Sequence, residues 1–357
     1  MKKIEDIDPN FKPGESIRES DIIFYNVKEE IFDLYGLYNP RGENQFKRMP
    51  DEAAAATGNE GVKRLYTNTS GGRVRFKTDS PYVAVSMVCP TVTRFPHMPF
   101  TGTTGLDLYI YNNNGYKYVN TFVVRDPKSD EYKYEGIYRF KNGEMRDITI
   151  NMPLYNDVSE LYIGVKEGST VTNGEKYIND KPIVYYGSSI TQGGCASKAG
   201  NSYQGIISRR MNCDFINLGF SGSAKGETSM AEYIAGLEMS CFVYDYDHNA
   251  PTVAHLEKTH KPMFDIIRKL HPDIPVIMMT RPGEGADVEE RKKVVYDTYK
   301  SAVAAGDENV YFIDGQSFYK ELDHGIGSVD GCHPNDLGFK CMADKLYEVL
   351  KNIDITK

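Results

Sequence analysis

Residues 184–194 read VYYGSSITQGG, and the interpretation of this stretch decides how the second half of the chain is understood. A run of apolar β-formers ends at Gly187, and two serines, Ser188 and Ser189, follow directly. Glycine and serine are ordinary turn residues, so the stretch alone fits a plain turn at the end of a strand. It also fits a strand end that presents a serine hydroxyl to a ligand. The segments around it decide between these two interpretations.

Downstream of residue 181, apolar runs alternate with segments of helical periodicity. The apolar runs are IVYYG, FINLGF, CFVYDYD, IPVIMMT and VYFID, and the helical segments are about 201–211, 229–237, 254–270, 287–305 and 335–352. Continuous apolar strands separated by helices predict an α/β fold, with a doubly wound parallel sheet of five strands covered on both faces. Such sheets bind ligands at the carboxyl ends of their strands. The residues directly after each strand are therefore the candidate site.

Between about residues 20 and 178, apolar and polar residues alternate with a period of two, as they do in half-buried β-strands. The runs are GRVRFKT, YVAVSMV, LDLYIY, YVNTFVV, YRFKNGEMRDITINM and ELYIGVKEG. The pairs Asn114-Gly115 and Asn142-Gly143 stand between strand-like runs, as hairpin turns do. Many short strands with turns between them predict a β-sandwich of the jelly-roll-like type. We therefore expect two domains, residues 1–178 and residues 179–357.

Polar residues and glycines follow the predicted strands of the second domain. They are Ser189 after the first strand, Gly219 and Gly222 after the second, Asn249 after the third, Arg281 after the fourth, and Asp330 and His333 before the last helix. A serine hydroxyl needs a base, for which His333 is the candidate, and the imidazole needs a carboxylate, which Asp330 can supply. The N–H groups of Ser189 and Gly222 and the Asn249 amide would then form an oxyanion hole.

Each of these features also has a purely structural interpretation. An Asp three residues before a His is common by chance, and FSGSAKG fits a flexible turn. Asn249, before Ala-Pro, fits a helix cap. The coincidence of all four features at the ends of the strands favours the catalytic interpretation.

Four sequence blocks resemble those of the SGNH (GDSL-like) hydrolases, which carry Ser, Gly, Asn and His in this order. The blocks are YGSSITQG with Ser189, NLGFSG with Gly222, DYDHNA with Asn249, and DGCHP with Asp330 and His333. Upstream, TGLDLYIY resembles the GxDLY motif of β-sandwich domains that precede certain SGNH esterases. The resemblance spans about residue 20 to the end, and it implies a flavodoxin-like catalytic domain. Two departures stand out: Ser188 replaces the usual acidic residue, and YDYDHNA replaces the usual Gly-x-Asn-Asp block.

Two other classes of function remain open at this point. Asp245, Asp247 and His248, with two histidines farther along, would be the ligands of a metal-dependent phosphoesterase. No motif with firm metal-ligand spacing supports this, and we expect His255 and His260 on a solvated helix. The third class is a carbohydrate-binding protein without catalysis, in which only the sandwich would act. The chain has the residue type that catalysis needs at every catalytic position, and this argues against a non-catalytic protein.

Composition limits the classes of binding partner and the cellular compartment that we expect for this protein. The net charge of −8 over 357 residues disfavours nucleic acid, and a polymeric anion would need a local basic patch. The N-terminus lacks a secretory pattern and no apolar run is long enough to span a bilayer, so we expect a cytoplasmic protein with no membrane partner. The six dispersed cysteines suit free thiols. A homo-oligomer is compatible with the sequence.

The resemblance implies ester hydrolysis through a serine acyl-enzyme, with no cofactor and no metal. The expected substrate is a small-molecule or oligosaccharide ester with a short acyl group, acetyl in the first place and carried by a carbohydrate. Arg281 and Phe100 are candidate substrate contacts, Phe100 because the loop 89–105 with His97 and Met98 would lean over the site. A sandwich loop far from Ser189, and a structural ion pair for Arg281, are the alternatives. Cys195 is expected to serve packing.

Overall fold

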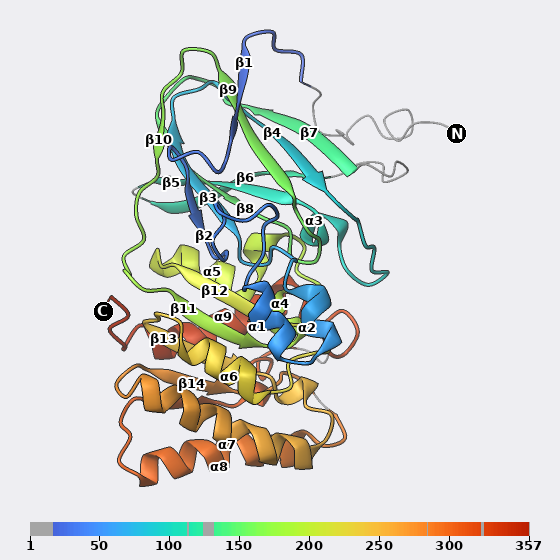
Figure 1. The fold of residues 1–357 in the computed structure, drawn as a ribbon, viewed down its shortest axis with the longest axis vertical. Helices are drawn as coiled ribbons and strands as arrows, with labels where there is room; N and C mark the ends of the chain where they lie inside the picture. Colours follow the sequence, from blue (N-terminus) through green and yellow to red (C-terminus); the bar gives the residue numbers. More distant parts are fainter. Residues whose placement is uncertain (1–16, 113, 124–131, 284, 323–324, 357) are drawn as a thin grey trace.

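The computed structural model describes residues 17–112, 114–123, 132–283, 285–322 and 325–356. A β-sandwich forms one end of the molecule and an α/β layer structure forms the other (Figure 1). The chain passes from the first to the second between β10 (Val171–Asn173) and β11 (Ile183–Gly187). The change of sequence periodicity near residue 180 marks this passage.

The first part consists of two antiparallel sheets that enclose an apolar core. One sheet has the order β1 (Ile22–Asn26), β9 (Glu160–Lys166), β4 (Tyr82–Cys89) and β7 (Tyr132–Arg139). The other has the order β10, β3 (Arg73–Thr78), β8 (Arg146–Asn151), β5 (Leu106–Asn112) and β6 (Gly115–Phe122), with β2 (Asp33–Tyr35) paired to β3. Fully buried side chains such as Val74, Val85, Ile148 and Ile163 fill the space between them. The predicted β-sandwich is confirmed, and the jelly-roll designation stays a prediction.

The two predicted hairpins have different outcomes. Asn112 pairs with Gly115 at the end of the antiparallel β5–β6 pair, so the first hairpin is confirmed. The second is wrong, because β7 pairs with β4 while β8 pairs with β3 and β5. The Asn142-Gly143 turn therefore carries the chain from one sheet of the sandwich to the other.

The second part is a parallel sheet of five strands with helices on both faces. The strand order is β12 (Phe215–Gly219), β11, β13 (Cys241–Asp245), β14 (Val276–Met279) and β15 (Val310–Ile313). The long helices are α5 (Tyr203–Met211), α6 (Thr228–Ala235), α7 (Val253–Leu270), α8 (Val288–Ala304) and α9 (Asp336–Leu350). This is the flavodoxin-like doubly wound order, with consecutive strands added on either side of the first. The predicted α/β fold and its strands and helices are confirmed.

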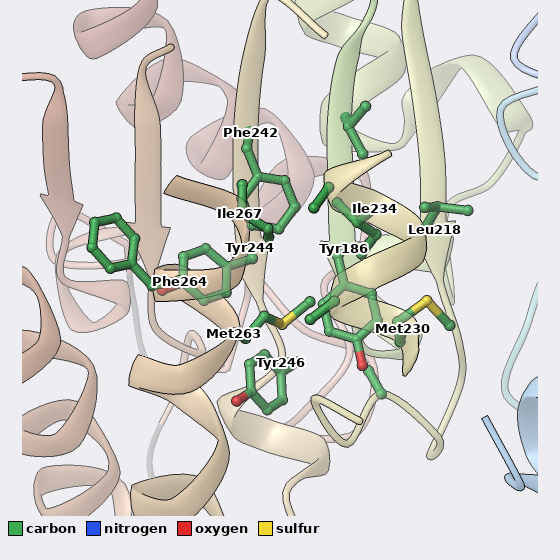
Figure 2. Packing of buried hydrophobic residues seen from close by; sticks show 14 of the residues in the cluster. Tyr186, Leu218, Met230, Ile234, Phe242, Tyr244, Tyr246, Met263, Phe264 and Ile267 are labelled. Atoms are coloured by element: carbon green, nitrogen blue, oxygen red, sulfur yellow. The ribbon is translucent and has the colours of Figure 1, made fainter. Parts of the chain in front are cut away.

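Each face of the parallel sheet has its own apolar core. On one face, Tyr186, Leu218 and Tyr244 pack against α6 and α7 through side chains such as Met230 and Met263 (Figure 2). On the other face, the sheet packs against α5 and α9, with Tyr185, Val243, Ile207, Phe339 and Met342 fully buried. Burial on both faces explains why these strands appear as continuous apolar runs in the sequence.

Within the described ranges, short helices that the sequence did not predict lie in the loops of both parts. They are α1 (Asp51–Ala56), α2 (Glu60–Leu65), α3 (Phe100–Thr103), α4 (Ser189–Gln192) and three 3₁₀ turns, Ala199–Asn201, Asp247–Asn249 and Gly315–Ser317. Val62 and Leu65 of α2 belong to the same core as Leu218 and Phe220 of the α/β part. Residues from both sides of position 178 thus share one core, and the division at 178/179 stays a prediction.

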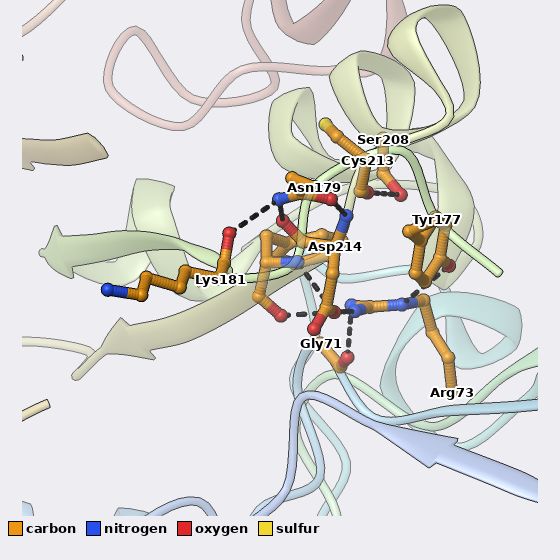
Figure 3. Close-up of polar contacts among 9 residues, drawn as sticks. Gly71, Arg73, Tyr177, Asn179, Lys181, Ser208, Cys213 and Asp214 are labelled. Carbon is orange, nitrogen blue, oxygen red and sulfur yellow. Dashed lines mark hydrogen bonds and ion pairs between the residues drawn. The ribbon is translucent and has the colours of Figure 1, made fainter. Parts of the chain in front are cut away.

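A buried arginine, Arg73, fixes the sandwich onto the parallel sheet. Arg73 of β3 forms an ion pair with Asp214 and donates to the carbonyls of Gly71 (2.6 Å) and Phe215 (3.1 Å) and to the Tyr177 hydroxyl (3.1 Å) (Figure 3). The fully buried guanidinium thus spans the junction between β3 and the start of β12.

The GxDLY motif contributes a second link between the two parts. Asp107, the acid of this motif, is fully buried in β5 and accepts the backbone N–H of Gly200 at 2.8 Å. Gly200 lies in the 3₁₀ turn before α5. The motif therefore stabilises the contact between the sandwich and the α/β part.

All six cysteines are free thiols, as predicted. Within the described ranges, none of the helices combines the length and the apolar character needed to cross a bilayer. The cytoplasmic location and the homo-oligomer stay predictions.

Candidate active site

The turn after β11 answers why a glycine and two serines end this strand. A Cβ atom on Gly187 would lie 1.8 Å from Oδ1 of Asp245 and 2.1 Å from Oγ1 of Thr191, so only glycine fits. Ser188 is the N-cap of α4, and its hydroxyl accepts the backbone N–H of Ile190 at 3.1 Å. Ser189 is then the first residue of the helix. The Ser188 that departs from the family pattern thus has a capping role in this chain.

Ser189, His333 and Asp330 form a continuous hydrogen-bonded series. Oγ of Ser189 lies 2.9 Å from Nε2 of His333, and Nδ1 of His333 lies 2.8 Å from Oδ2 of Asp330. The other oxygen of Asp330 accepts the backbone N–H groups of His333 (2.7 Å) and Cys332 (3.0 Å). The loop before α9 therefore supplies both the base and its carboxylate, and the serine comes from the first strand of the sheet.

The ionisation of Asp330 determines which nitrogen of the His333 imidazole carries the proton. Burial acts to raise the pKa of this carboxyl, but the hydrogen bonds from His333 and Cys332 outweigh it and lower the pKa to about 2. Asp330 is therefore ionised at neutral pH and accepts a proton-bearing Nδ1 of His333. That leaves Nε2 as an acceptor that faces the Ser189 hydroxyl.

The two candidate oxyanion donors other than Ser189 lie in loops at the same edge of the sheet. Gly222 is exposed in the loop after β12 and has a φ of +66°, in the left-handed region that favours glycine. Asn249 ends the 3₁₀ turn after β13, and its Oδ1 accepts the backbone N–H of Ala224 at 3.3 Å. This bond fixes the amide and leaves Nδ2 as its donor. The oxyanion roles of both residues stay predictions.

Comparison with protein families agrees with these strand-end features. Residues 180–351 match the GDSL-like lipase/acylhydrolase family, and residues 22–171 match a family described as the N-terminus of Esterase_SGNH_hydro-type, named GxDLY. The chain belongs to the SGNH (GDSL-like) esterases. The family membership makes the protein a carboxylic ester hydrolase, as the sequence predicted.

Solved structures support the same fold over nearly the whole SGNH esterase chain. A GDSL-like lipase from Bacteroides ovatus has a TM-score of 0.83 at 28% identity and covers 94% of this chain and 99% of its own. The salicylyl-acyltransferase SsfX3 from a tetracycline biosynthetic pathway has a TM-score of 0.75 at 17% identity, covering 95% and 100%. The acetyl xylan esterase Est2A from Butyrivibrio proteoclasticus has a TM-score of 0.59 at 13% identity, covering 93% and 98%. No curated protein sequence matches the chain.

A buried carboxyl that the sequence suggested only as a metal ligand lies under the nucleophile turn of the esterase. Asp245 accepts a hydrogen bond from the Thr191 hydroxyl and another from Tyr203 at 3.2 Å. Burial raises its pKa to about 8, although the Thr191 and Tyr203 hydroxyls act in the opposite direction. Asp245 therefore connects β13 to α4, directly behind Ser189.

The other residues of the metal alternative have separate partners. Asp247 accepts the backbone N–H groups of His248 (2.9 Å) and Arg281 (3.1 Å). Nε2 of His248 lies 3.0 Å from Sγ of Cys332, and His255 contacts the Lys225 carbonyl at 2.8 Å. The groups of described residues that could hold a metal include none of these acids or histidines.

His260 corrects the expectation of a solvated helix. Its side chain is only 1% exposed. The ring stacks on Tyr244 with centroids 4.6 Å apart, and Nδ1 lies 2.9 Å from the Thr298 hydroxyl. Because α7 is amphipathic, His260 faces the sheet, where an aromatic neighbour and a hydroxyl satisfy the imidazole.

The loop 89–105 does approach the site, through a residue other than Phe100. The ring centroid of His97 lies 5.4 Å from that of His333, and Met98 packs into the α/β core. Phe100 packs against the core of the sandwich instead. Sequence reasoning identified the loop but not which side chain reaches the site, because that contact depends on how the sandwich docks onto the α/β part.

Two sets of described residues at the site offer metal-type ligands, namely His97, Cys195 and His333, and Asp330, Cys332 and His333. In each set the ligand atoms lie within 4.8 Å of one another. A cation in either set would compete with Ser189 for His333. Cys195 is buried, and its thiol donates to the His97 carbonyl at 3.5 Å, in line with the predicted packing role.

Arg281 lies beside this site after β14. Burial lowers the pKa of His248 to about 4, and the positive charge of Arg281 adds to that shift. The Arg281 carbonyl accepts the Gln316 side chain at 3.4 Å. The contact of Arg281 with substrate stays a prediction.

Proposed function

We propose that the esterase hydrolyses acetyl or similarly short acyl esters of carbohydrates through an acyl-enzyme on Ser189. The hydrogen-bonded series from Ser189 through His333 to Asp330 carries this proposal, because it joins a nucleophile, a base and an orienting carboxylate at distances of 2.8–2.9 Å. The name of the structurally similar acetyl xylan esterase supports the choice of acetyl and of a carbohydrate.

The first half of the proposed reaction forms the acyl-enzyme. Nε2 of His333 takes the proton of the Ser189 hydroxyl as Oγ attacks the ester carbonyl carbon. The resulting oxyanion accepts hydrogen bonds from the Ser189 and Gly222 N–H groups and from Asn249. The bond to the alcohol oxygen then breaks, and His333 gives its proton to the departing alcohol.

The second half releases the acyl group. Water enters, gives a proton to Nε2 of His333 and attacks the acyl carbon, so that a second oxyanion forms at the same place. Its collapse breaks the bond to Oγ of Ser189, which recovers the proton from His333. The carboxylate of Asp330 stabilises the imidazolium in both halves and stays ionised throughout.

The experiment compares the wild type with Ser189→Ala on p-nitrophenyl acetate, butyrate and octanoate, each with and without EDTA. We expect activity that falls with chain length, is unaffected by EDTA and drops at least about 10³-fold in Ser189→Ala. Ser301→Ala, an exposed serine on α8, is the matched control and keeps full activity. Activity that survives Ser189→Ala but is lost with EDTA would favour the metal-dependent phosphoesterase class. A wild type that is inactive both on these esters and on acetylated sugars would favour the carbohydrate-binding protein without catalysis.

A further inference from the structure

A cavity of about 360 Å³ lies beside the nucleophile turn. Nine of the ten residues that line it belong to the segment 64–157, and the tenth is Ser221 in the loop after β12. The segment includes α2, the loop after β4 and the turn after β8. The wall of this cavity is therefore supplied almost entirely by the part of the chain that precedes the catalytic sheet.

Hydrogen bonds join this wall to α4, the helix that Ser189 begins. The hydroxyl of Tyr155, a lining residue, donates to the carbonyl of Ser189 at 3.0 Å. The N–H of Ser221, another lining residue, donates to Oε1 of Gln192 at 2.9 Å, and Gln192 ends the helix that Ser189 begins. Ser221 also directly precedes Gly222. A ligand in the cavity would thus lie between the nucleophile turn and the loop proposed to bind the oxyanion.

The chemistry of the wall suits a polyhydroxylated ring better than an alkyl chain. Seven of the ten lining residues are polar or charged, and Phe95 and Tyr155 add aromatic surface. The carboxylate of Asp157 is held by the Thr67 hydroxyl (3.1 Å) and the Asn68 amide (2.7 Å). An alkyl chain would cover such polar groups without giving them hydrogen bonds, which is costly. Hydroxyl groups of a sugar would satisfy them.

The cation at this cavity has no partner among the residues that the structure describes. Arg64 is exposed on α2, and its guanidinium forms no hydrogen bond, ion pair or ring contact with any residue in the described ranges. The adjacent Lys63, by contrast, pairs with Glu60 at 2.8 Å. Arg64 is the only cation among the ten residues of this wall.

A second cavity that Arg64 also lines adds another cation. This space of about 550 Å³ is lined by both Arg64 and Lys225, and the ammonium of Lys225 likewise makes no polar contact with the described residues. Of the two acids there, Glu60 binds Lys63, and Glu227 accepts the Asn59 amide at 2.5 Å through Oε1 while its buried Oε2 accepts no hydrogen bond from the described residues. Among the described residues, Arg64 and Lys225 are the cations of these two cavities whose charged groups have no protein partner, so both can attract an anionic ligand.

We propose that the 360 Å³ cavity binds the alcohol portion of the ester and that Arg64 selects alcohols that carry a carboxylate, such as an acylated sugar acid. The inference rests on the proposed function, because it assigns a substrate class to the same site. A guanidinium binds a carboxylate with paired, charge-assisted hydrogen bonds, and this gives it preference over a hydroxymethyl group at the same position.

The test uses two substrates that differ only at one carbon, the mono-acetylated methyl glucuronoside and the mono-acetylated methyl glucoside. The wild type is expected to hydrolyse the first with a kcat/KM about 10-fold higher, the size of one charge-assisted hydrogen bond. In Arg64→Gln this ratio falls to about one, and in Arg64→Lys part of it remains. Lys63→Gln, which removes a neighbouring charge outside the cavity, keeps the wild-type ratio.

Separate outcomes address the inference and the function on which it rests. Equal hydrolysis of both sugar esters by the wild type, or an equal loss on both in Arg64→Gln, would overturn the inference while Ser189-dependent hydrolysis of p-nitrophenyl acetate upholds the function. A wild type that cleaves p-nitrophenyl acetate and neither sugar ester would overturn it as well. Hydrolysis that persists in Ser189→Ala would instead remove the proposed function itself.

Discussion

Asp330→Asn keeps the shape of the side chain and removes the charge that orients His333. The amide would stabilise the wrong tautomer of the imidazole and would not stabilise the imidazolium, so kcat on p-nitrophenyl acetate should fall about 10³–10⁴-fold. KM should change little, because Asp330 does not face the substrate. Asp297→Asn, an exposed acid on α8, is the control. A loss of less than about 10-fold in Asp330→Asn would contradict the assigned role.

The same residue sets a limit on the pH profile. The hydrogen bonds to Asp330 hold its pKa at about 2 against burial, so the carboxylate remains ionised well below neutral pH. Its contribution to stability is present above the unfolded value near 4 and is lost as the pH falls toward 2. Loss of activity between pH 5 and 7 would therefore not arise from protonation of Asp330.

At the residue scale, the sequence alone predicted which side chains lie together where their chemistry and their spacing both pointed to one site. Asp330 and His333 share one short loop, and Ser189 ends the first strand of a parallel sheet, so their approach followed from topology. His97 could not be assigned in this way. Its contact with His333 depends on how the sandwich docks, and no local pattern contains that information.

At the scale of single elements, Asp245 gives β13 a pH-dependent contact with the nucleophile helix α4. Because burial raises the pKa of Asp245 to about 8, the folded state holds one more proton than the unfolded state between about pH 4 and pH 8. Stability from this group is complete below the unfolded pKa and is lost as the pH rises through the folded value. Asp245→Asn removes that titration and retains the shape of the protonated acid.

Urea unfolding at pH 5 and pH 8 measures this effect. The wild type should lose stability relative to Asp245→Asn as the pH rises, by at most about 1.4 kcal/mol for each pH unit. The control is Asp265→Asn on the exposed face of α7, measured at the same two pH values. A constant gap between wild type and Asp245→Asn would show that Asp245 is ionised in the folded state.

Elements also show where local patterns stop being informative. Asn142-Gly143 correctly marks a turn, but a turn signal does not state which strands pair, and here β7 and β8 join different sheets. The sequence predicts His260 on a solvated helix, but the structure buries its side chain. The neighbouring Tyr244 and Thr298 come from β13 and α8, and they make its burial favourable.

At the scale of the whole molecule, the sequence predicted two fold types but not how closely they are joined. Val62 and Leu65 look like part of a loop between strands, yet they complete a core with Leu218 and Phe220. Such contacts connect residues more than 150 positions apart in the chain. Their cause is the docking of two sheets, which periodicity within either sheet cannot reveal.

Arg48 tests whether this docking matters for catalysis. The guanidinium is fully buried and donates to the carbonyls of Asn217 (3.0 Å), Gly219 (2.6 Å) and Leu65 (2.6 Å), while its Cζ atom lies 4.7 Å from the centroid of the Phe220 ring. Burial lowers its pKa to about 9, so Arg48 is charged at neutral pH. It thereby links α2 to the end of β12, where the loop with Gly222 begins.

Arg48→Met retains the length of the side chain but removes the guanidinium donor from three carbonyls, one of which, that of Leu65, also accepts the backbone N–H of Asn68 at 3.1 Å. We expect a loss of about 3–5 kcal/mol in the free energy of unfolding and, under conditions where the variant remains folded, a lower kcat with a smaller change in KM. The kcat effect follows because the displaced strand end carries a proposed oxyanion donor. Arg210→Met, which removes a surface pair with Asp344 and a contact with the Tyr347 ring, should cost less than about 1 kcal/mol and leave kcat unchanged. If Arg48→Met loses stability but keeps the wild-type kcat, the N-terminal part supports the fold of the sheet without positioning the loop that holds Gly222.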